Sequence, residues 1–163
     1  MNAPQPLSAL VRELWQTKLR PFNLAFVDTS DHEAALVGDN FVLTFYSDRD
    51  GLGGFYYRIP NDIAAPLQYD PARFLFLKRM ESEPRPPKQA FSSFSEEAAY
   101  GLSRLVTLLI ERCPDILRGE DAWIKDYEAR WGHDVVHPLN HKKLREIYRR
   151  GLAQRSMETT ATR

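Results

Sequence analysis

The sequence predicts an α+β fold, in which an antiparallel sheet of about four to five strands, roughly residues 22–80, packs against a helical C-terminal half. Short alternating runs of aromatic and β-branched residues dominate the first half. After residue 93, apolar residues recur every three or four positions. An order of strands followed by helices is typical of α+β domains, with the helices covering one face of the sheet.

The bulk composition predicts one folded domain. The chain has 163 residues, of which 43% are hydrophobic and 27% charged. A domain of this length buries roughly 70% of the surface that its unfolded chain exposes. We therefore expect a single domain over residues 1–155, followed by a disordered tail at 156–163.

Charge and cysteine content exclude several classes of protein. The chain has 22 Lys plus Arg against 22 Asp plus Glu, so no overall field attracts it to nucleic acid or an acidic membrane. Its one cysteine, Cys113, excludes an internal disulfide and a multi-thiolate zinc site. The longest apolar run, LVTLLI, falls far short of the ~20 residues that span a bilayer. We expect a cytoplasmic protein without a membrane partner; its oligomeric state stays open.

In the first half, residues 7–19 carry one apolar stripe and predict a helix that Pro21 ends. Short apolar runs at 22–29 and 33–39 predict two strands joined by a tight connection. Residues 41–47 and 55–59 predict an antiparallel hairpin, which Pro60 closes. Residues 61–72 are irregular, and the alternation in RFLFLKRM (73–80) predicts one more strand.

Alternation assigns the hairpin side chains to two faces of the sheet. On the first strand Phe41, Leu43 and Phe45 oppose Val42, Thr44 and Tyr46, and on the second Phe55, Tyr57 and Ile59 oppose Tyr56 and Arg58.

The second half begins after the proline-rich connector ESEPRPPKQAFSSF, which can continue neither a sheet nor a helix interior. Ser93 and Glu96 fit a capping box and start a long helix that Pro114 stops. PDILRG predicts a short helical turn with Gly119 in the left-handed conformation. A helix carrying Trp123 and Trp131 ends at Gly132, and a last helix runs from about residue 140 to 155.

The stretch DRDGLGG (48–54) resembles a loop built for chemistry. A phosphate-binding loop feeds its glycines into a helix N-terminus, but these glycines lead into a strand. A calcium loop needs a late acidic ligand, and after Asp50 the next acidic residue is Asp62, beyond that strand. We therefore interpret the stretch as a turn that exposes Asp48, Arg49 and Asp50.

Three histidines and the cysteine are further candidates for a metal site or a nucleophile, and we expect a structural role for each. His133, His137 and His141 lie four residues apart, as metal ligands on one helix do, but Pro138 and Gly132 interrupt any regular helical face. We expect polar residues in a connector and no metal or cofactor. Cys113 continues an apolar stripe at a helix end, where the dipole does not activate a thiol, so we expect it in the core.

Local charge clusters suggest two interaction surfaces. Residues 142–155 present a basic helix face, for which a solvated outer face is the favoured interpretation and nucleic acid an alternative. Residues 111–134 are acidic and contain Trp123 and Trp131, a combination that could bind a basic partner, although the spacing of the two tryptophans predicts that at least one of them lies in the core.

The stretches CPDILRGEDAWIKDYEARW (113–131) and VLTFYSDRD (42–50) introduce a resemblance to known proteins. Over about residues 20–132, this layout resembles small bacterial immunity proteins of polymorphic toxin and contact-dependent or type VI systems. No invariant motif accompanies the resemblance. It implies a cytoplasmic, non-enzymatic inhibitor that masks a cognate toxin domain.

We therefore expect an immunity-type protein that binds a toxin by protein contact. The candidate anchors are the hairpin tip (Asp48, Arg49, Asp50) and the acidic segment (Asp121, Trp123, Asp126).

Two alternatives remain. One is an enzyme or small-ligand binder that uses a sheet-face pocket formed by Tyr46, Tyr56, Arg58 and a histidine. The other is a nucleic-acid or adaptor module that uses the basic last helix.

Overall fold

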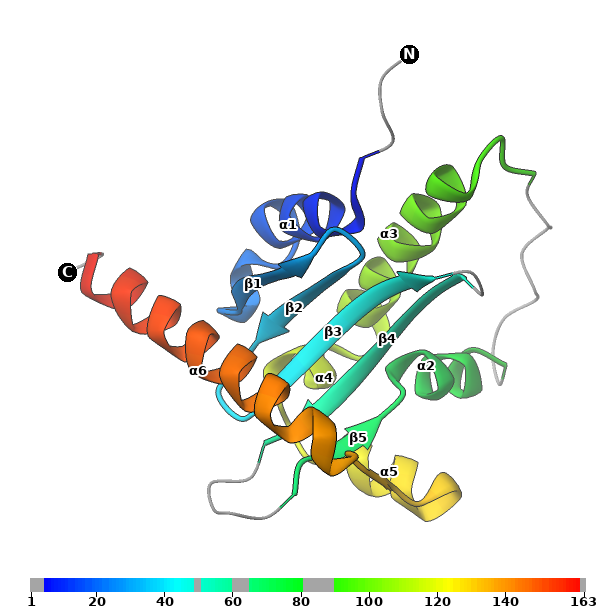
Figure 1. The fold of residues 1–163 in the computed structure, drawn as a ribbon. Coiled ribbons are helices and arrows are strands. Elements are labelled where there is room, and N and C mark those ends of the chain that lie inside the picture. The colour runs from blue at the N-terminus through cyan, green and yellow to red at the C-terminus, as the bar shows by residue number, and fades with distance from the viewer. Residues whose placement is uncertain (1–4, 49–50, 60–64, 81–89, 162–163) are drawn as a thin grey trace.

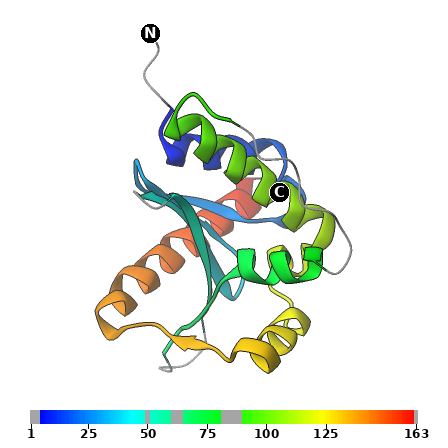
Figure 2. The ribbon, with the colours of Figure 1, turned by 90° about the vertical axis from the view of Figure 1, so that its right-hand side faces the viewer.

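The computed structural model describes residues 5–48, 51–59, 65–80 and 90–161. Within these ranges, six strands form one antiparallel sheet in the order β1-β2-β3-β4-β5-β6, and helices pack on both of its faces (Figures 1 and 2). The α+β class is confirmed, with slightly more strands than predicted.

Five strands and two α-helices lie in the first half of the described chain, and four α-helices and a two-residue strand lie in the second half. The strands are β1 (Ala25–Ser30), β2 (Glu33–Val37), β3 (Phe41–Asp48), β4 (Gly51–Arg58), β5 (Leu67–Tyr69) and β6 (Asp134–Val135). The helices are α1 (Leu7–Thr17), α2 (Pro71–Met80), α3 (Phe94–Arg112), α4 (Pro114–Arg118), α5 (Ala122–Trp131) and α6 (Pro138–Ala161), with a short 3₁₀ helix at Arg20–Phe22.

The main core lies between one face of the sheet and helices α1 to α5. Leu43 of β3, Tyr56 of β4 and Leu102 of α3 are fully buried in it. Tyr56 stacks on Phe41 with ring centroids 4.8 Å apart and meets Trp123 of α5 edge-on at 4.9 Å. These aromatic contacts join the sheet to the helical half of the chain.

A second core lies on the opposite face, beneath α6 (Figure 2). Leu144 and Ile147 of α6 pack there against buried side chains of β1, β2 and β3. The helix lies close to the sheet at Gly151, where an added Cβ would lie 2.4 Å from Val37 Cβ. The expectation of helices on one face only is therefore incomplete.

The helix boundaries predicted at Ser93, Gly119 and Gly132 agree with the structure. Ser93 Oγ accepts a hydrogen bond from Glu96 N at 3.1 Å, while the Glu96 carboxylate accepts from Ser92 N at 3.2 Å. Gly119 and Gly132 end α4 and α5 with φ angles of 71° and 70°, which favour glycine. Helix α6 continues to Ala161, through most of the segment expected to be a tail.

The strand predicted at 73–80 is wrong, because these residues form most of α2. Asp70 accepts a hydrogen bond from Arg73 N at 3.2 Å and Pro71 occupies the first helical position, so a local helix start outweighs the alternation. The neighbouring segment 61–72, predicted irregular, contributes β5, whose outer edge pairs with the two residues of β6.

We expect Gly151→Val to lower the free energy of unfolding by about 1–3 kcal/mol, because the added side chain would overlap Val37 and push α6 away from the sheet. The matched control Ala153→Val lies on the same helix, is exposed, and is expected to change stability by less than about 0.5 kcal/mol. Urea unfolding of both variants measures the difference. Equal stabilities would contradict the close contact.

Stability should fall above about pH 10, because burial raises the pKa of Tyr56 beyond that of an exposed phenol. The unfolded chain then releases this proton first, and unfolding becomes easier by about 1.4 kcal/mol per pH unit per tyrosine. Within the described residues the Tyr56 hydroxyl has no hydrogen-bond partner, so Tyr56→Phe should be tolerated at neutral pH. The free energy of unfolding, measured between neutral and alkaline pH, should fall less steeply in Tyr56→Phe than in the wild type. Parallel pH profiles of the two proteins would contradict this role of Tyr56.

Candidate functional site

The stretch around DRDGLGG reverses the chain between two paired strands. Strands β3 and β4 pair from Phe41↔Arg58 to Asp48↔Gly51, and Gly51 has a φ of 122°. The predicted antiparallel hairpin is confirmed. Asp48 is exposed at the end of β3, whereas Arg49 and Asp50 lie outside the described residues.

Next to Asp48 the surface is hollowed. Figure 1 shows that α1 and α3 begin near this end of the sheet. One open hollow of about 420 Å³ is lined by His32, Ser47, Asp48 and Phe94, and a second of about 170 Å³ continues between α1 and α3. Phe94 remains 48% exposed. We call the four residues His32, Ser47, Asp48 and Phe94 the tip surface.

In the acidic segment, the expected aromatic anchor Trp123 is buried in the core. Trp123 is 1% exposed and packs against Tyr56, Tyr69 and Phe74, so it cannot contact a partner without leaving the core. Asp126 is exposed, and Asp121 is 75% exposed but forms an ion pair with Arg58. The carboxylates of Asp121 and Asp126 therefore lie at this surface, but Trp123 does not.

The proposed pocket of Tyr46, Tyr56 and Arg58 is contradicted by the register. Tyr56 and Arg58 pair with Leu43 and Phe41 and face the main core, whereas Tyr46 faces the opposite side of the sheet. These side chains therefore cannot line one cavity.

Arg58 instead connects β4 to the connection between α4 and α5. Its guanidinium donates to the carbonyls of Gly119 at 3.0 Å and Glu120 at 3.4 Å, and also binds Asp121. The Arg58 side chain is only 14% exposed and lies 5.7 Å from the centre of the Tyr56 ring. Its contacts are those of a structural clamp.

The three histidines bind separate groups. His133 Nδ1 lies 3.4 Å from a Glu128 carboxylate oxygen, His137 Nδ1 accepts from Leu139 N at the start of α6, and His141 Nε2 lies 2.6 Å from the Val136 carbonyl. The part of the chain that the structure describes contains no group of three or more His, Cys, Asp or Glu placed to hold a metal. Cys113 is buried in the main core, as its apolar stripe predicted.

Several cations of α6 attach the helix to the sheet. Lys143 Nζ lies 3.1 Å from Glu33, Arg155 Nη1 lies 2.6 Å from Asp39, and Arg150 donates to the Asp28 carbonyl at 3.4 Å. The basic character that suggested a nucleic-acid helix is therefore partly used within the fold. Among the described residues, no helix is both long and apolar enough to cross a bilayer.

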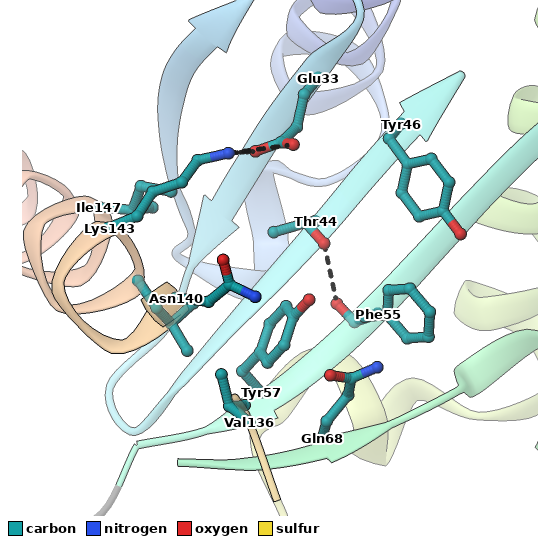
Figure 3. Close-up of a pocket in the computed structure, with 11 residues that line it drawn as sticks. Glu33, Thr44, Tyr46, Phe55, Tyr57, Gln68, Val136, Asn140, Lys143 and Ile147 are labelled. Carbon is teal, nitrogen blue, oxygen red and sulfur yellow. Dashed lines mark hydrogen bonds and ion pairs between the residues drawn. The ribbon is translucent and has the colours of Figure 1, made fainter. Parts of the chain in front are cut away.

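A pocket of about 280 Å³ lies on the α6 face of the sheet, where α6 leaves β3 and β4 uncovered (Figure 3). Tyr46, Phe55 and Tyr57 form its floor; the Tyr46 and Phe55 rings are 5.7 Å apart and within 19° of parallel. An added Cβ on Gly53 would lie 2.4 Å from Tyr46 Cζ, so this ring lies directly over the glycine. Figure 3 shows both rings lying flat against the strands.

Neutral polar groups and one ion pair complete the walls. The Gln68 and Asn140 amides line the pocket from β5 and α6. Burial raises the pKa of Tyr57, against the opposing effect of its hydrogen bond with Thr44, so this phenol is neutral at physiological pH. Lys143 is neutralised by Glu33. The pocket thus offers aromatic surface and uncharged donors and acceptors.

Of the residues that line this pocket, Tyr46 alone was predicted from the sequence to line one. The alternation of β3 and β4, once paired, could have placed Phe55 and Tyr57 beside it. No local signal indicated Gln68, Asn140 or Lys143, because they reach the pocket from β5 and α6.

Comparison of the chain with protein-family models, with curated proteins and with solved structures finds no match.

We expect Arg58→Ala to lower the free energy of unfolding by about 2–3 kcal/mol, because it removes charged hydrogen bonds to carbonyls in the α4–α5 connection. Asp121→Ala should cost less than about 1 kcal/mol, since that carboxylate is largely in water. Urea unfolding compares the two variants. A stable Arg58→Ala protein would contradict the clamp and reopen a ligand role for Arg58.

Proposed function

We propose that this chain is a cytoplasmic immunity-type protein that binds and neutralises a cognate toxin domain through the tip surface, without chemistry of its own. The observation that carries the proposal is the half-exposed Phe94 beside Asp48 in a hollowed surface. A large aromatic side chain left in water at a concave surface is typical of the residues that anchor protein interfaces. The buried Trp123 makes the acidic segment the weaker of the two candidate anchors.

Carboxylates near Phe94 favour a basic partner. Glu96 and Glu97 are exposed on the same first turn of α3, and Asp31 is exposed in the β1–β2 turn next to His32. Hydrogen bonds from Ser92 hold the pKa of Glu96 below its usual range, so its charge persists at mildly acidic pH. A toxin that acts on nucleic acid must itself be basic where it binds, and an acidic inhibitor would associate with it rapidly.

The test first looks for a toxin domain encoded immediately upstream, which the immunity role predicts. The chain is then co-expressed with that domain, and growth and complex formation on gel filtration are scored. We expect the wild-type chain to restore growth. Phe94→Ala should weaken the complex by about 2 kcal/mol, or roughly thirtyfold, as loss of a central anchor does. Asp48→Lys should slow association and reduce its dependence on salt.

Leu139→Ala is the matched control, because Leu139 is 84% exposed but begins α6, outside the tip surface. It should bind and protect like the wild type. Asp126→Lys tests the acidic segment in the same assay. Protection that survives Phe94→Ala and Asp48→Lys but fails in Asp126→Lys would move the interface to α5, and failure of the wild type to protect would reject the immunity role.

A further inference from the structure

The pocket between α6 and the sheet, separate from the tip surface, presents flat aromatic faces. Tyr46 lies over Gly53 and nearly parallel to Phe55, so the two rings form a continuous floor on the open part of β3 and β4 (Figure 3). Both side chains are partly exposed. Aromatic rings lying on an open antiparallel sheet can stack a planar ligand, and they tolerate any ring that has a π-face.

The polar groups of the pocket favour a ligand whose bound part carries no charge. The ammonium of Lys143 already lies 3.1 Å from a Glu33 oxygen, so the pair adds no net charge. The amides of Gln68 and Asn140 each offer both a donor and an acceptor across the floor. Such amides form paired hydrogen bonds with the edge of a heteroaromatic ring.

We propose that this pocket binds a nucleobase, stacked on Tyr46 and Phe55 and hydrogen-bonded at its edge by Gln68 and Asn140. The volume of about 280 Å³ accommodates one base with its sugar towards the opening. A base can come from a free nucleoside, a nucleotide or a single strand of nucleic acid. The pocket would recognise the base itself. Binding through the phosphates is not favoured, because the 22 cationic side chains of the chain are balanced by 22 anionic ones.

The test is calorimetric titration of the full chain with adenosine, guanosine, cytidine and uridine, with their 5′-monophosphates, and with a short single-stranded RNA of mixed sequence. At least one nucleoside should bind, whereas ribose alone should not. Tyr46→Leu keeps an apolar cover over Gly53 but removes the flat ring, and should weaken binding by about tenfold or more, as loss of one base–aromatic stack does. Equal affinity for nucleoside, nucleotide and RNA indicates a free base or nucleoside as the source, and tighter, salt-dependent RNA binding indicates a strand.

Asn140→Trp provides a second variant that does not remove a core residue. Asn140 is exposed on α6, so the indole should fill the pocket and abolish binding while the melting temperature stays unchanged. The control Leu139→Trp adds the same group one residue earlier, outside the pocket lining, and should bind like the wild type. The proposal is overturned if no base-bearing probe binds the wild type at millimolar concentration, or if Tyr46→Leu and Asn140→Trp both bind as tightly as it does.

Discussion

The register between β3 and β4 decides which aromatic side chains hold the fold together and which remain for binding. Leu43 pairs with Tyr56 and both face the main core, while Thr44 pairs with Phe55 on the opposite face. A shift by one residue would exchange these two sets and expose the core aromatics. Two glycines of β4 accommodate this register. An added Cβ would collide with the Tyr46 ring at Gly53 and with the Thr44 carbonyl oxygen at Gly54.

The same register separates the two candidate sites although they are neighbours in the chain. Tyr46 turns towards α6 and the pocket, and Asp48, on the same strand face, borders the hollow because it ends β3. Ser47, between them, points to the other face and lines the hollow beside Phe94. Alternation of side chains along one strand thus sends adjacent residues to different surfaces. A protein partner at the tip surface and a small ligand in the pocket would contact different groups, so substitutions at one site can leave the other intact.

Local signals in the sequence predicted much of the fold but little of the pocket. Caps and glycine stops act within a few residues, so Ser93, Gly119 and Gly132 could be assigned correctly. Alternation predicts the wrong structure for residues 73–80, because the signals that start the helix, Asp70 and Pro71, lie just before this segment. Strand β6 has only two residues, too few for any periodicity, and it exists because it completes the edge of β5.

Side-chain roles depended on packing between distant segments, which periodicity does not report. The spacing of Trp123 and Trp131 predicted that at least one of them lies in the core, but which one does so depends on the part of α5 that meets β4. Arg58 lies between aromatic residues in the sequence, as a ligand-binding arginine can, yet its donors reach carbonyls more than sixty positions away, at Gly119 and Glu120. The sequence indicates the chemistry of such a residue, and the fold selects its partner.

The pocket itself follows from how a straight helix crosses a twisted sheet. Twist turns successive strands away from one line, so a long helix contacts the sheet along a diagonal and leaves a corner open. Helix α6 lies close against Val37 at Gly151, and nearer its start Leu144 and Ile147 fill the second core. Towards its start, Asn140 and Lys143 are polar and do not close the remaining space over β4. The open corner is therefore bounded by polar helix residues and floored by aromatic strand residues, a combination that suits a planar ligand better than continued core packing.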